Sequence, residues 1–126
     1  MMANGRRILI VDDEEGFLSL IQEALTIRGF EVIVASNAVA AGMEIALKKP
    51  EAILMDIKMS GIDGLQACEA IKRNPITKDI PIMIVSALSG DSDIKKAYRA
   101  GVLDYFIKPI NIEKVVAKLK DVLGIA

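Results

Sequence analysis

The feature that most constrains this chain is an alternation, repeated five times, of short apolar runs with stretches of helical periodicity. The apolar runs are rich in Ile, Val and Leu, which is typical of strands buried on both faces of a parallel sheet. Strands separated by helices predict βαβ units with right-handed crossovers, so we expect a parallel sheet with helices on both faces. The runs cover residues 8–11, 31–35, 52–55, 80–85 and 103–107.

The intervening stretches carry apolar residues at the spacing of a helix with one buried face. The fourth stretch, residues 89–101, is the weakest, because its lead-in is polar and contains glycine and its stripe is short. We expect it to be the least stable helix, from which a moving part would be drawn. The expected inward-facing residues are, helix by helix, Phe17, Ile21, Ala24 and Leu25; Val39, Met43, Ala46 and Leu47; Leu65, Cys68 and Ile71; Ile94, Ala97 and Tyr98; and Ile112, Val115, Leu119 and Val122.

The commonest arrangement of five such units has the strand order 2-1-3-4-5. We therefore predict an α/β fold with a doubly wound, five-stranded parallel sheet of (βα)5 type. At 126 residues the chain has the length of one domain, so a single domain over residues 1–126 is expected. In this arrangement a ligand-binding crevice lies at the carboxyl ends of the first and third strands.

Composition excludes several classes of function. The net charge of −1 provides no basic field for nucleic acid or for an anionic membrane. Because the chain has no histidine, it cannot carry a phosphohistidine, a Ser-His pair or a His-ligated metal. Cys68 is the single cysteine, and no apolar run approaches the roughly 20 residues of a membrane span. We expect a cytoplasmic protein that binds neither nucleic acid directly nor membrane.

Polar side chains stand where the predicted strands end. Because the carboxyl ends of parallel strands meet at one edge of the sheet, we expect these side chains to converge. Taken singly each has an ordinary role, such as an acid at a helix N-terminus, a turn cap, a loop hydroxyl or a solvated lysine. Their joint placement at several strand ends favours a functional site. In chain order they are Asp12 and Asp13, Asp56, Ser86 and Lys108; Ala87 follows Ser86 and Pro109 follows Lys108 at the ends of their strands.

Electrostatics indicate the chemistry of such a site. Two carboxylates about 4 Å apart repel by roughly 4 kcal/mol at an effective dielectric constant near 20. Three carboxylates either raise a pKa or require a cation, and Lys108 supplies only one charge. An all-oxygen cluster suits a hard divalent ion, Mg²⁺ or Mn²⁺. With a metal and a lysine neutralising the oxygens, one aspartate can attack phosphorus, so phosphoryl transfer is the expected chemistry.

Four segments, in order and at suitable spacing, resemble the receiver domain of two-component response regulators. The segment ILIVDDEE is similar to the acidic pocket of that family, and LMDIKMSGIDG to its phospho-acceptor loop. IMIVSA resembles the strand that carries the switch hydroxyl, and AGVLDYFIKP resembles the fifth strand. The resemblance covers essentially the whole chain and implies a flavodoxin-like fold similar to that of chemotaxis regulators.

The resemblance also implies roles for single residues at the acidic pocket. Asp56 would be the phospho-acceptor and would share in a metal site. Asp13 would bind the metal directly, whereas Asp12 would reach it mainly through water. The backbone carbonyl of Lys58 would complete the protein's share of the Mg²⁺ or Mn²⁺ coordination.

The resemblance also implies a second set of residues, which would bind the phosphoryl group and change conformation when it is present. Ser86, with Ala87 beside it, would hydrogen-bond the phosphoryl group. Lys108 would pair with a phosphoryl oxygen, and a cis peptide bond at Pro109 would position it. Tyr105, three residues before Lys108, matches the aromatic side chain that turns inward as Ser86 moves.

The implied function is a phosphorylation-dependent switch in a two-component or phosphorelay system. A sensor histidine kinase or a histidine phosphotransfer protein would supply the phosphoryl group. The surface formed by the fourth helix, fifth strand and fifth helix would then change, control a downstream protein or output domain, and offer a dimer interface. The chain would catalyse only its own phosphorylation and dephosphorylation, so it would not be an enzyme that acts on other substrates.

Two other classes of protein stay open on the sequence. An Asp-nucleophile phosphatase of the haloacid-dehalogenase type has its second Asp two residues after the nucleophile on the first strand, whereas Asp12 and Asp13 are adjacent here. A flavodoxin-like FMN carrier needs a Ser/Thr-rich phosphate loop, where this chain has the acidic segment DDEEG. The chain departs from the receiver pattern at Ser60, where proline is common, and at Ile110, where phenylalanine is common.

Overall fold

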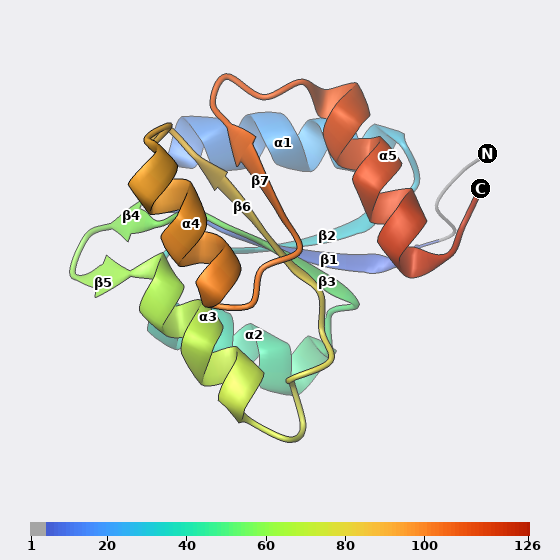
Figure 1. The fold of residues 1–126 in the computed structure, drawn as a ribbon. Coiled ribbons are helices and arrows are strands. Elements are labelled where there is room, and N and C mark those ends of the chain that lie inside the picture. Colours follow the sequence, from blue (N-terminus) through green and yellow to red (C-terminus); the bar gives the residue numbers. More distant parts are fainter. Residues whose placement is uncertain (1–4) are drawn as a thin grey trace.

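The structure, a computed structural model, describes residues 5–126 (Figure 1). Residues 1–4, which the predicted domain 1–126 includes, lie outside the described residues. Strands and helices alternate along the chain, and a two-stranded hairpin is inserted after the third strand. The elements are β1 (Arg7–Val11), α1 (Glu15–Ile27), β2 (Glu31–Ala35), α2 (Ala38–Lys48), β3 (Ala52–Met55), β4 (Lys58–Met59), β5 (Ile62–Asp63), α3 (Gly64–Arg73), β6 (Ile82–Ser86), α4 (Asp91–Arg99), β7 (Asp104–Ile107) and α5 (Ile112–Leu123).

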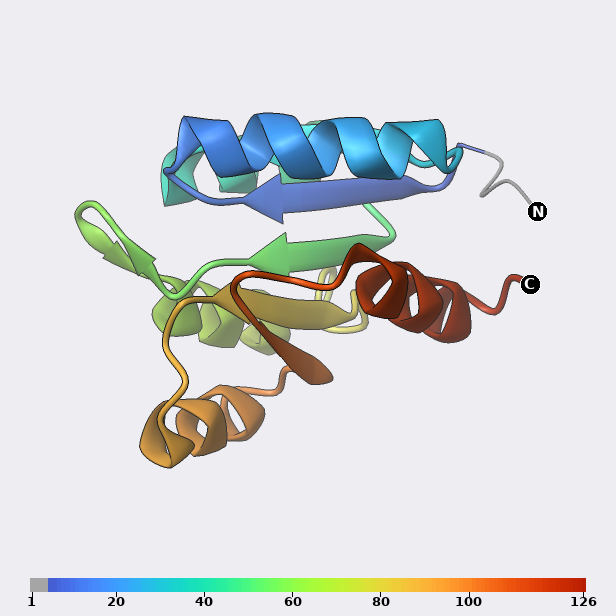
Figure 2. The same ribbon diagram turned by 90° about the horizontal axis from the view of Figure 1, so that it is seen from above.

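The main sheet has five parallel strands in the order β2-β1-β3-β6-β7 (Figures 1 and 2). With the inserted hairpin set aside, this is the predicted order 2-1-3-4-5, and the predicted fold class is confirmed. The bounds of four strands agree with the prediction to within one residue, but β6 begins at Ile82 instead of Ile80. Ile80 belongs to the preceding turn, where its N–H donates to the Thr77 carbonyl at 3.0 Å.

Helices cover both faces of the sheet. α1 and α5 lie on one face, whereas α2, α3 and α4 lie on the other (Figures 1 and 2). Successive residues of a strand point to opposite faces, so Leu9 packs in the core under α2 and α3 while Ile8 and Ile10 pack in the core under α1 and α5. Burial on both faces explains why the central strands are continuous apolar runs.

The buried stripe predicted for the second helix is wrong. α2 turns Ala41 and Ile45 toward the sheet, while Val39, Met43 and Leu47 are 76%, 59% and 74% exposed. The sequence of this helix, AVAAGMEIALK, is apolar on nearly every side, so its periodicity does not single out one face. A short, largely apolar helix therefore leaves a stripe of large side chains in solvent.

The remaining helices follow their predicted stripes more closely. The stripes predicted for α1, α3 and α5 are buried or half-buried throughout. In α4, Ala97 is buried and Ile94 is half-buried, but Tyr98 is 47% exposed. None of the described helices has both the length and the apolar composition needed to cross a bilayer.

The hairpin of β4 and β5 follows Asp56 almost directly, and the alternation of strands and helices does not predict it. The sequence indicates only its turn, at Ser60 and Gly61, where Gly61 takes a positive φ of 74°. The hairpin is closed at Gly64, whose N–H donates to the Ile57 carbonyl at 2.7 Å. A Cβ at Gly64 would overlap the Asp56 carbonyl, so glycine is needed for this close approach. The hairpin thereby fixes the path of the chain just after Asp56.

Candidate functional site

The candidate site lies where the neighbouring strands β1 and β3 end. The two strands are in register at Val11 and Met55, so the residues that follow them, Asp12 and Asp56, stand side by side. The Asp56 N–H donates to the Val11 carbonyl at 2.9 Å and continues the ladder by one bond. Carboxylate oxygens of Asp12, Asp13 and Asp56 lie within 4.8 Å of one another. The structure therefore brings together the three acids predicted to converge.

Asp12 is buried and held by an ion pair. Its side chain is 2% exposed, and Lys108 Nζ lies 2.7 Å from its Oδ2 atom. Its Oδ1 atom accepts a hydrogen bond from the Glu14 N–H at 2.9 Å. Both oxygens of this carboxylate therefore have partners, and its charge is compensated by a cation that comes from the far end of the chain.

Asp56 is also buried, but its negative charge is compensated less than that of Asp12. The residue is 8% exposed, and its Oδ1 atom accepts a hydrogen bond from the Ile57 N–H at 2.8 Å. Its Oδ2 atom lies 3.8 Å from Lys108 Nζ, beyond hydrogen-bonding distance. Burial raises the pKa of Asp56, and the charge of Asp12 raises it further, while Lys108 acts in the opposite direction. Oδ2 is thus an oxygen without a hydrogen bond among the described residues.

Asp13 is exposed and is held from the hairpin. Its Oδ2 atom accepts hydrogen bonds from the Ser60 N–H at 2.7 Å and from the Ser60 hydroxyl at 3.1 Å. These two bonds, the backbone bond first, lower the pKa of Asp13. Sequence reasoning noted Ser60 only as a departure at a turn and missed this contact. The signal available was a hydroxyl residue in the loop after Asp56, but the path of the hairpin could not be foreseen.

Lys108 is positioned by contacts with β6, with α1 and with the loop that follows β1. Its N–H donates to the Ser86 carbonyl at 2.8 Å, which registers β7 against β6. Its ammonium lies 4.2 Å from the centroid of the Phe17 ring on α1 and reaches Asp12 beyond it. The Lys108–Pro109 peptide bond is cis, as the resemblance implied. Sequence reasoning assigned Phe17 only to the core and missed its contact with the lysine.

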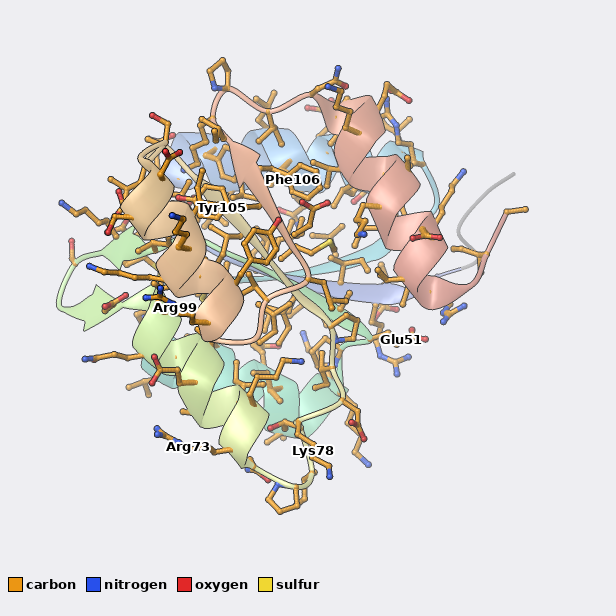
Figure 3. All side chains as sticks on the ribbon, viewed as in Figure 1. Glu51, Arg73, Lys78, Arg99, Tyr105 and Phe106 are labelled. Atoms are coloured by element: carbon orange, nitrogen blue, oxygen red, sulfur yellow. The ribbon has the colours of Figure 1, made fainter. Side chains whose placement is uncertain are left out.

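A chain of hydrogen bonds links Ser86 to Tyr105 through Leu88. The Leu88 N–H donates to Ser86 Oγ at 3.1 Å, and the Tyr105 hydroxyl donates to the Leu88 carbonyl at 2.6 Å. Burial raises the pKa of Tyr105, and the nearby Ser86 hydroxyl opposes that shift. Tyr105 lies on the α4 side of β7 and Phe106 on the α5 side (Figure 3). Ser86 is buried and Ala87 beside it is exposed, so only the hydroxyl side chain belongs to this network.

The acidic cluster fits a small, hard cation. Oxygens bound to one Mg²⁺ ion lie at most about 4.2 Å apart, so carboxylates within 4.8 Å need only a small movement or one bridging water. Asp13 is the accessible member, and it lines a cavity of about 590 Å³ together with Lys58 and Ser60 of the hairpin. Of the residues expected to hold the metal, Asp13 and Lys58 therefore line this cavity, whereas Asp12 and Asp56 are buried.

Comparisons with known proteins agree with this geometry. The family described as "Response regulator receiver domain" matches residues 8–120. The chain is 36% identical over 119 residues to the phosphate regulon transcriptional regulatory protein PhoB of Pseudomonas aeruginosa, covering 94% of this chain and 52% of that protein. It is 34% identical over 114 residues to the response regulator PleD of Caulobacter vibrioides, covering 90% of this chain and 25% of that protein.

A solved structure gives the same result for the fold. The crystal structure of a two-component response regulator from Clostridium difficile shares 30% identity and a TM-score of 0.87, covering 94% of this chain and 95% of that one. The chain spans about half the length of PhoB and a quarter of the length of PleD. The chain therefore belongs to the family of response regulator receiver domains.

Proposed function

We propose that this receiver domain is a phosphorylation-dependent signalling switch that accepts a phosphoryl group on Asp56. One observation carries the proposal. Asp12, Asp13 and Asp56 form a cluster at one sheet edge, and Lys108 lies 2.7 Å from Asp12 but 3.8 Å from Asp56. One acid is thus paired with the lysine, one is open to a cation, and one has an oxygen left to react.

The proposed donor is the phosphohistidine of a sensor kinase or phosphotransfer protein, since this chain has no histidine of its own. Asp56 Oδ2 attacks phosphorus, the new P–O bond makes an acyl phosphate, and the P–N bond of the donor breaks. The departing imidazole keeps the electron pair and takes up a proton. Lys108 Nζ, 3.8 Å from Oδ2, is placed to donate to a phosphoryl oxygen. A bound Mg²⁺ would supply neutralising charge, held by Asp13, Asp56 and the Lys58 carbonyl, with Asp12 acting through water.

The proposed switch runs through the Ser86–Leu88–Tyr105 chain of hydrogen bonds. A phosphoryl group adds about 1.5 to 2 negative charges and three acceptor oxygens. The Ser86 hydroxyl accepts from the Leu88 N–H and also interacts with the Tyr105 hydroxyl, and on phosphorylation its proton would turn to a phosphoryl oxygen. Movement of Ser86 would shift Leu88 and with it the carbonyl that Tyr105 binds. The change would then reach α4, β7 and α5.

We propose that this α4–β7–α5 surface meets a downstream protein or output domain and supports a dimer. Exposed apolar side chains at Tyr98, Leu103 and Ile107 support that assignment. PhoB is named as a transcriptional regulatory protein, and we propose that any such output by this receiver is indirect. We also propose that the whole chain, residues 1–126, acts as one receiver unit in the cytoplasm, where its phosphoryl donor would present phosphohistidine.

Labelling with radioactive acetyl phosphate tests the site. The wild-type chain should be labelled in Mg²⁺, labelling should disappear in Asp56→Asn, and a chelator should abolish it in the wild type. Asp121→Asn, which removes an exposed carboxylate on α5, serves as the matched control and should label fully. Undiminished labelling of Asp56→Asn, or labelling that ignores the chelator, would overturn the assignment.

The same preparation separates the switch from the phosphatase alternative. A switch should bind one phosphoryl group per chain and release it slowly, whereas a phosphatase would turn over an added phosphomonoester many times. Multiple turnover that is lost in Asp56→Asn would favour the enzyme.

A further inference from the structure

A second concave surface lies far from the acidic cluster, between the carboxyl-terminal halves of α2 and α3. It is a groove of about 620 Å³, and its lining is mostly apolar. Ile45 and Ala46 form the α2 side, Ala70 and Ile71 form the α3 side, and the loop after α3 closes one end with Ile76. Ile76 is 90% exposed, an unusual position for a large apolar side chain. The groove therefore offers apolar surface that the fold itself does not use.

The groove continues into the exposed stripe of α2. Residues four apart share a helix face, so Val39, Met43 and Leu47 form one ridge. At 100° per residue, Gly42 and Ala46, which line the groove, lie on the side of it that faces the ridge. Both are small, and a Cβ built at Gly42 has no neighbour within 4 Å. The groove and the ridge thus form one apolar surface, with a shallow depression at Gly42 that we call the saddle.

The loop that closes the groove is held in shape by hydrogen bonds. The Lys72 ammonium donates to the Lys78 carbonyl at 3.0 Å and to the Ile80 carbonyl at 2.7 Å. The Thr77 hydroxyl donates to the Ile71 carbonyl at 2.8 Å. Because these bonds fix the loop before anything binds, a ligand would not have to order it.

Charge at the rim distinguishes between possible occupants. Lys49 lines the groove, Arg73 and Lys78 each adjoin a lining residue in the chain, and none of the three has an ion pair with the described residues. Arg73 and Lys78 flank the carboxyl end of α3 (Figure 3). Asp79 is an acid of the same loop, and it lies close enough to the Lys72 ammonium to act on its charge. The chain as a whole carries a net charge of −1, so the positive rim is a local feature.

We propose that this groove is a docking site for an amphipathic helix of a partner protein, with apolar residues on one face and acidic residues beside them. The apolar face would cover the ridge and groove, and its acids would meet the three cations of the rim. A second copy of this chain fits less well, because pairing the same surface would bring two positive rims together. The partner would therefore bind on the α2–α3 side of the sheet, away from α4, β7 and α5.

A synthetic peptide tests the proposal on the intact chain. The probe is a fluorescent helix of about 16 residues with leucine at helical spacing and glutamate elsewhere, compared with the same peptide carrying lysine for glutamate. Fluorescence anisotropy should show the acidic peptide binding at least tenfold more tightly. Amide NMR shifts should change along α2, α3 and the loop after α3. Equal binding of both peptides, no binding, or shifts elsewhere would overturn the proposal.

Two pairs of variants locate the site. Gly42→Gln fills the saddle at a helical position with open space and should weaken peptide binding at least tenfold, whereas Gly16→Gln makes the same change in open space on α1 and should not. Lys78→Glu should also weaken binding, and Lys95→Glu on α4 should not. Thermal unfolding shows that each variant is folded. If Gly42→Gln instead abolishes self-association in sedimentation and leaves peptide binding intact, a second copy is the occupant and the proposal fails.

Discussion

Asp56 is less stable as an anion than an aspartate in water, because it is buried beside Asp12 and its contact with Lys108 is long. A raised folded-state pKa means that the folded chain holds this proton more tightly than the unfolded chain does. The resulting stabilisation is fully present below the unfolded pKa and is lost as pH rises through the folded pKa. At neutral pH the ionised side chain therefore lowers the free energy of unfolding.

We accordingly expect Asp56→Asn to be more stable than the wild type at pH 7 without divalent cations. The difference should shrink as pH falls toward and below 3.8, the ordinary pKa of an aspartate, because both side chains are then neutral. For a domain of this size each 1 kcal/mol shifts Tm by about 4 °C, so calorimetry across this pH range resolves the effect. A stability difference that did not vary with pH would show that ionisation of Asp56 is not its cause.

Lys58, two residues after Asp56, is expected to lengthen the life of the acyl phosphate. Its side chain is exposed and lines the cavity beside Asp13, where its long stem can screen an attacking water. Lys58→Ala should shorten the half-life of labelled Asp56, and a tenfold change needs only about 1.4 kcal/mol of barrier. Loss of label in Mg²⁺ measures it, with Lys95→Ala as control. An unchanged or longer half-life would refute this role.

The sequence predicts the members of the acidic cluster better than it predicts what holds them. Asp12, Asp56 and Lys108 follow from the rule that parallel strands end at one edge, which requires only the order of the elements. Ser60 and Phe17 do not follow from that rule. The contact of Ser60 with Asp13 depends on the path of the β4–β5 hairpin. The contact of Phe17 with Lys108 depends on the side-chain conformation of that lysine. Both are settled by tertiary packing.

At the scale of elements, α4 is the helix with the weakest attachment. It runs only from Asp91 to Arg99, has no side-chain cap at its start, and fully buries only Ala97. Two hydrogen bonds hold the residues around α4. The Tyr98 hydroxyl donates to Asp104 Oδ1 at 3.3 Å, and the Tyr105 hydroxyl donates to the Leu88 carbonyl. These few contacts agree with the short apolar stripe of its sequence and make it the element that a switch can move at least cost.

Hydrogen exchange should therefore change most in residues 88–101 when a phosphoryl mimic such as beryllofluoride is added with Mg²⁺. Tyr105→Phe keeps the ring but loses the bond to Leu88, which is worth about 1 kcal/mol, so exchange in this segment should already be faster without the mimic. Asp56→Asn is the control that should show no response to the mimic. A change confined to α1 and α2 would contradict a switch that runs through Ser86 and Tyr105.

The fate of α2 shows where sequence patterns fail for an element. The buried face of a helix can be predicted from its sequence when polar residues mark the outer face, as in α3 and α5. α2 carries Ala, Val, Met, Ile and Leu around most of its surface, so the wheel allows several inward faces. The sheet selects the face with Ala41 and Ile45, because small and branched side chains fit there, and Val39, Met43 and Leu47 stay in solvent.

At the scale of the whole molecule, phosphorylation should favour a dimer through the α4–β7–α5 surface. Sedimentation with and without beryllofluoride should show the shift, because movement of α4 rearranges the exposed apolar residues there. Leu103→Glu places a charge in that surface and should weaken the dimer at least tenfold while Asp56 still labels. Leu20→Glu alters a leucine on α1 that is also exposed, 67% against 48% for Leu103, and should leave the dimer intact. A dimer sensitive to Leu20→Glu alone would locate the interface on α1.

The ion pair between Asp12 and Lys108 joins residues 96 positions apart. During synthesis Asp12, Asp13 and Asp56 leave the ribosome well before Lys108, at about 5 to 20 residues per second. Until β7 docks beside β6, Asp12 lacks the ion pair with Lys108 that compensates its charge in the finished fold. A chain that stops short of the last strand therefore has the three acids of the cluster but lacks the lysine that pairs with Asp12. The acidic cluster therefore reaches its native charge balance only after the last strand has been synthesised and has docked.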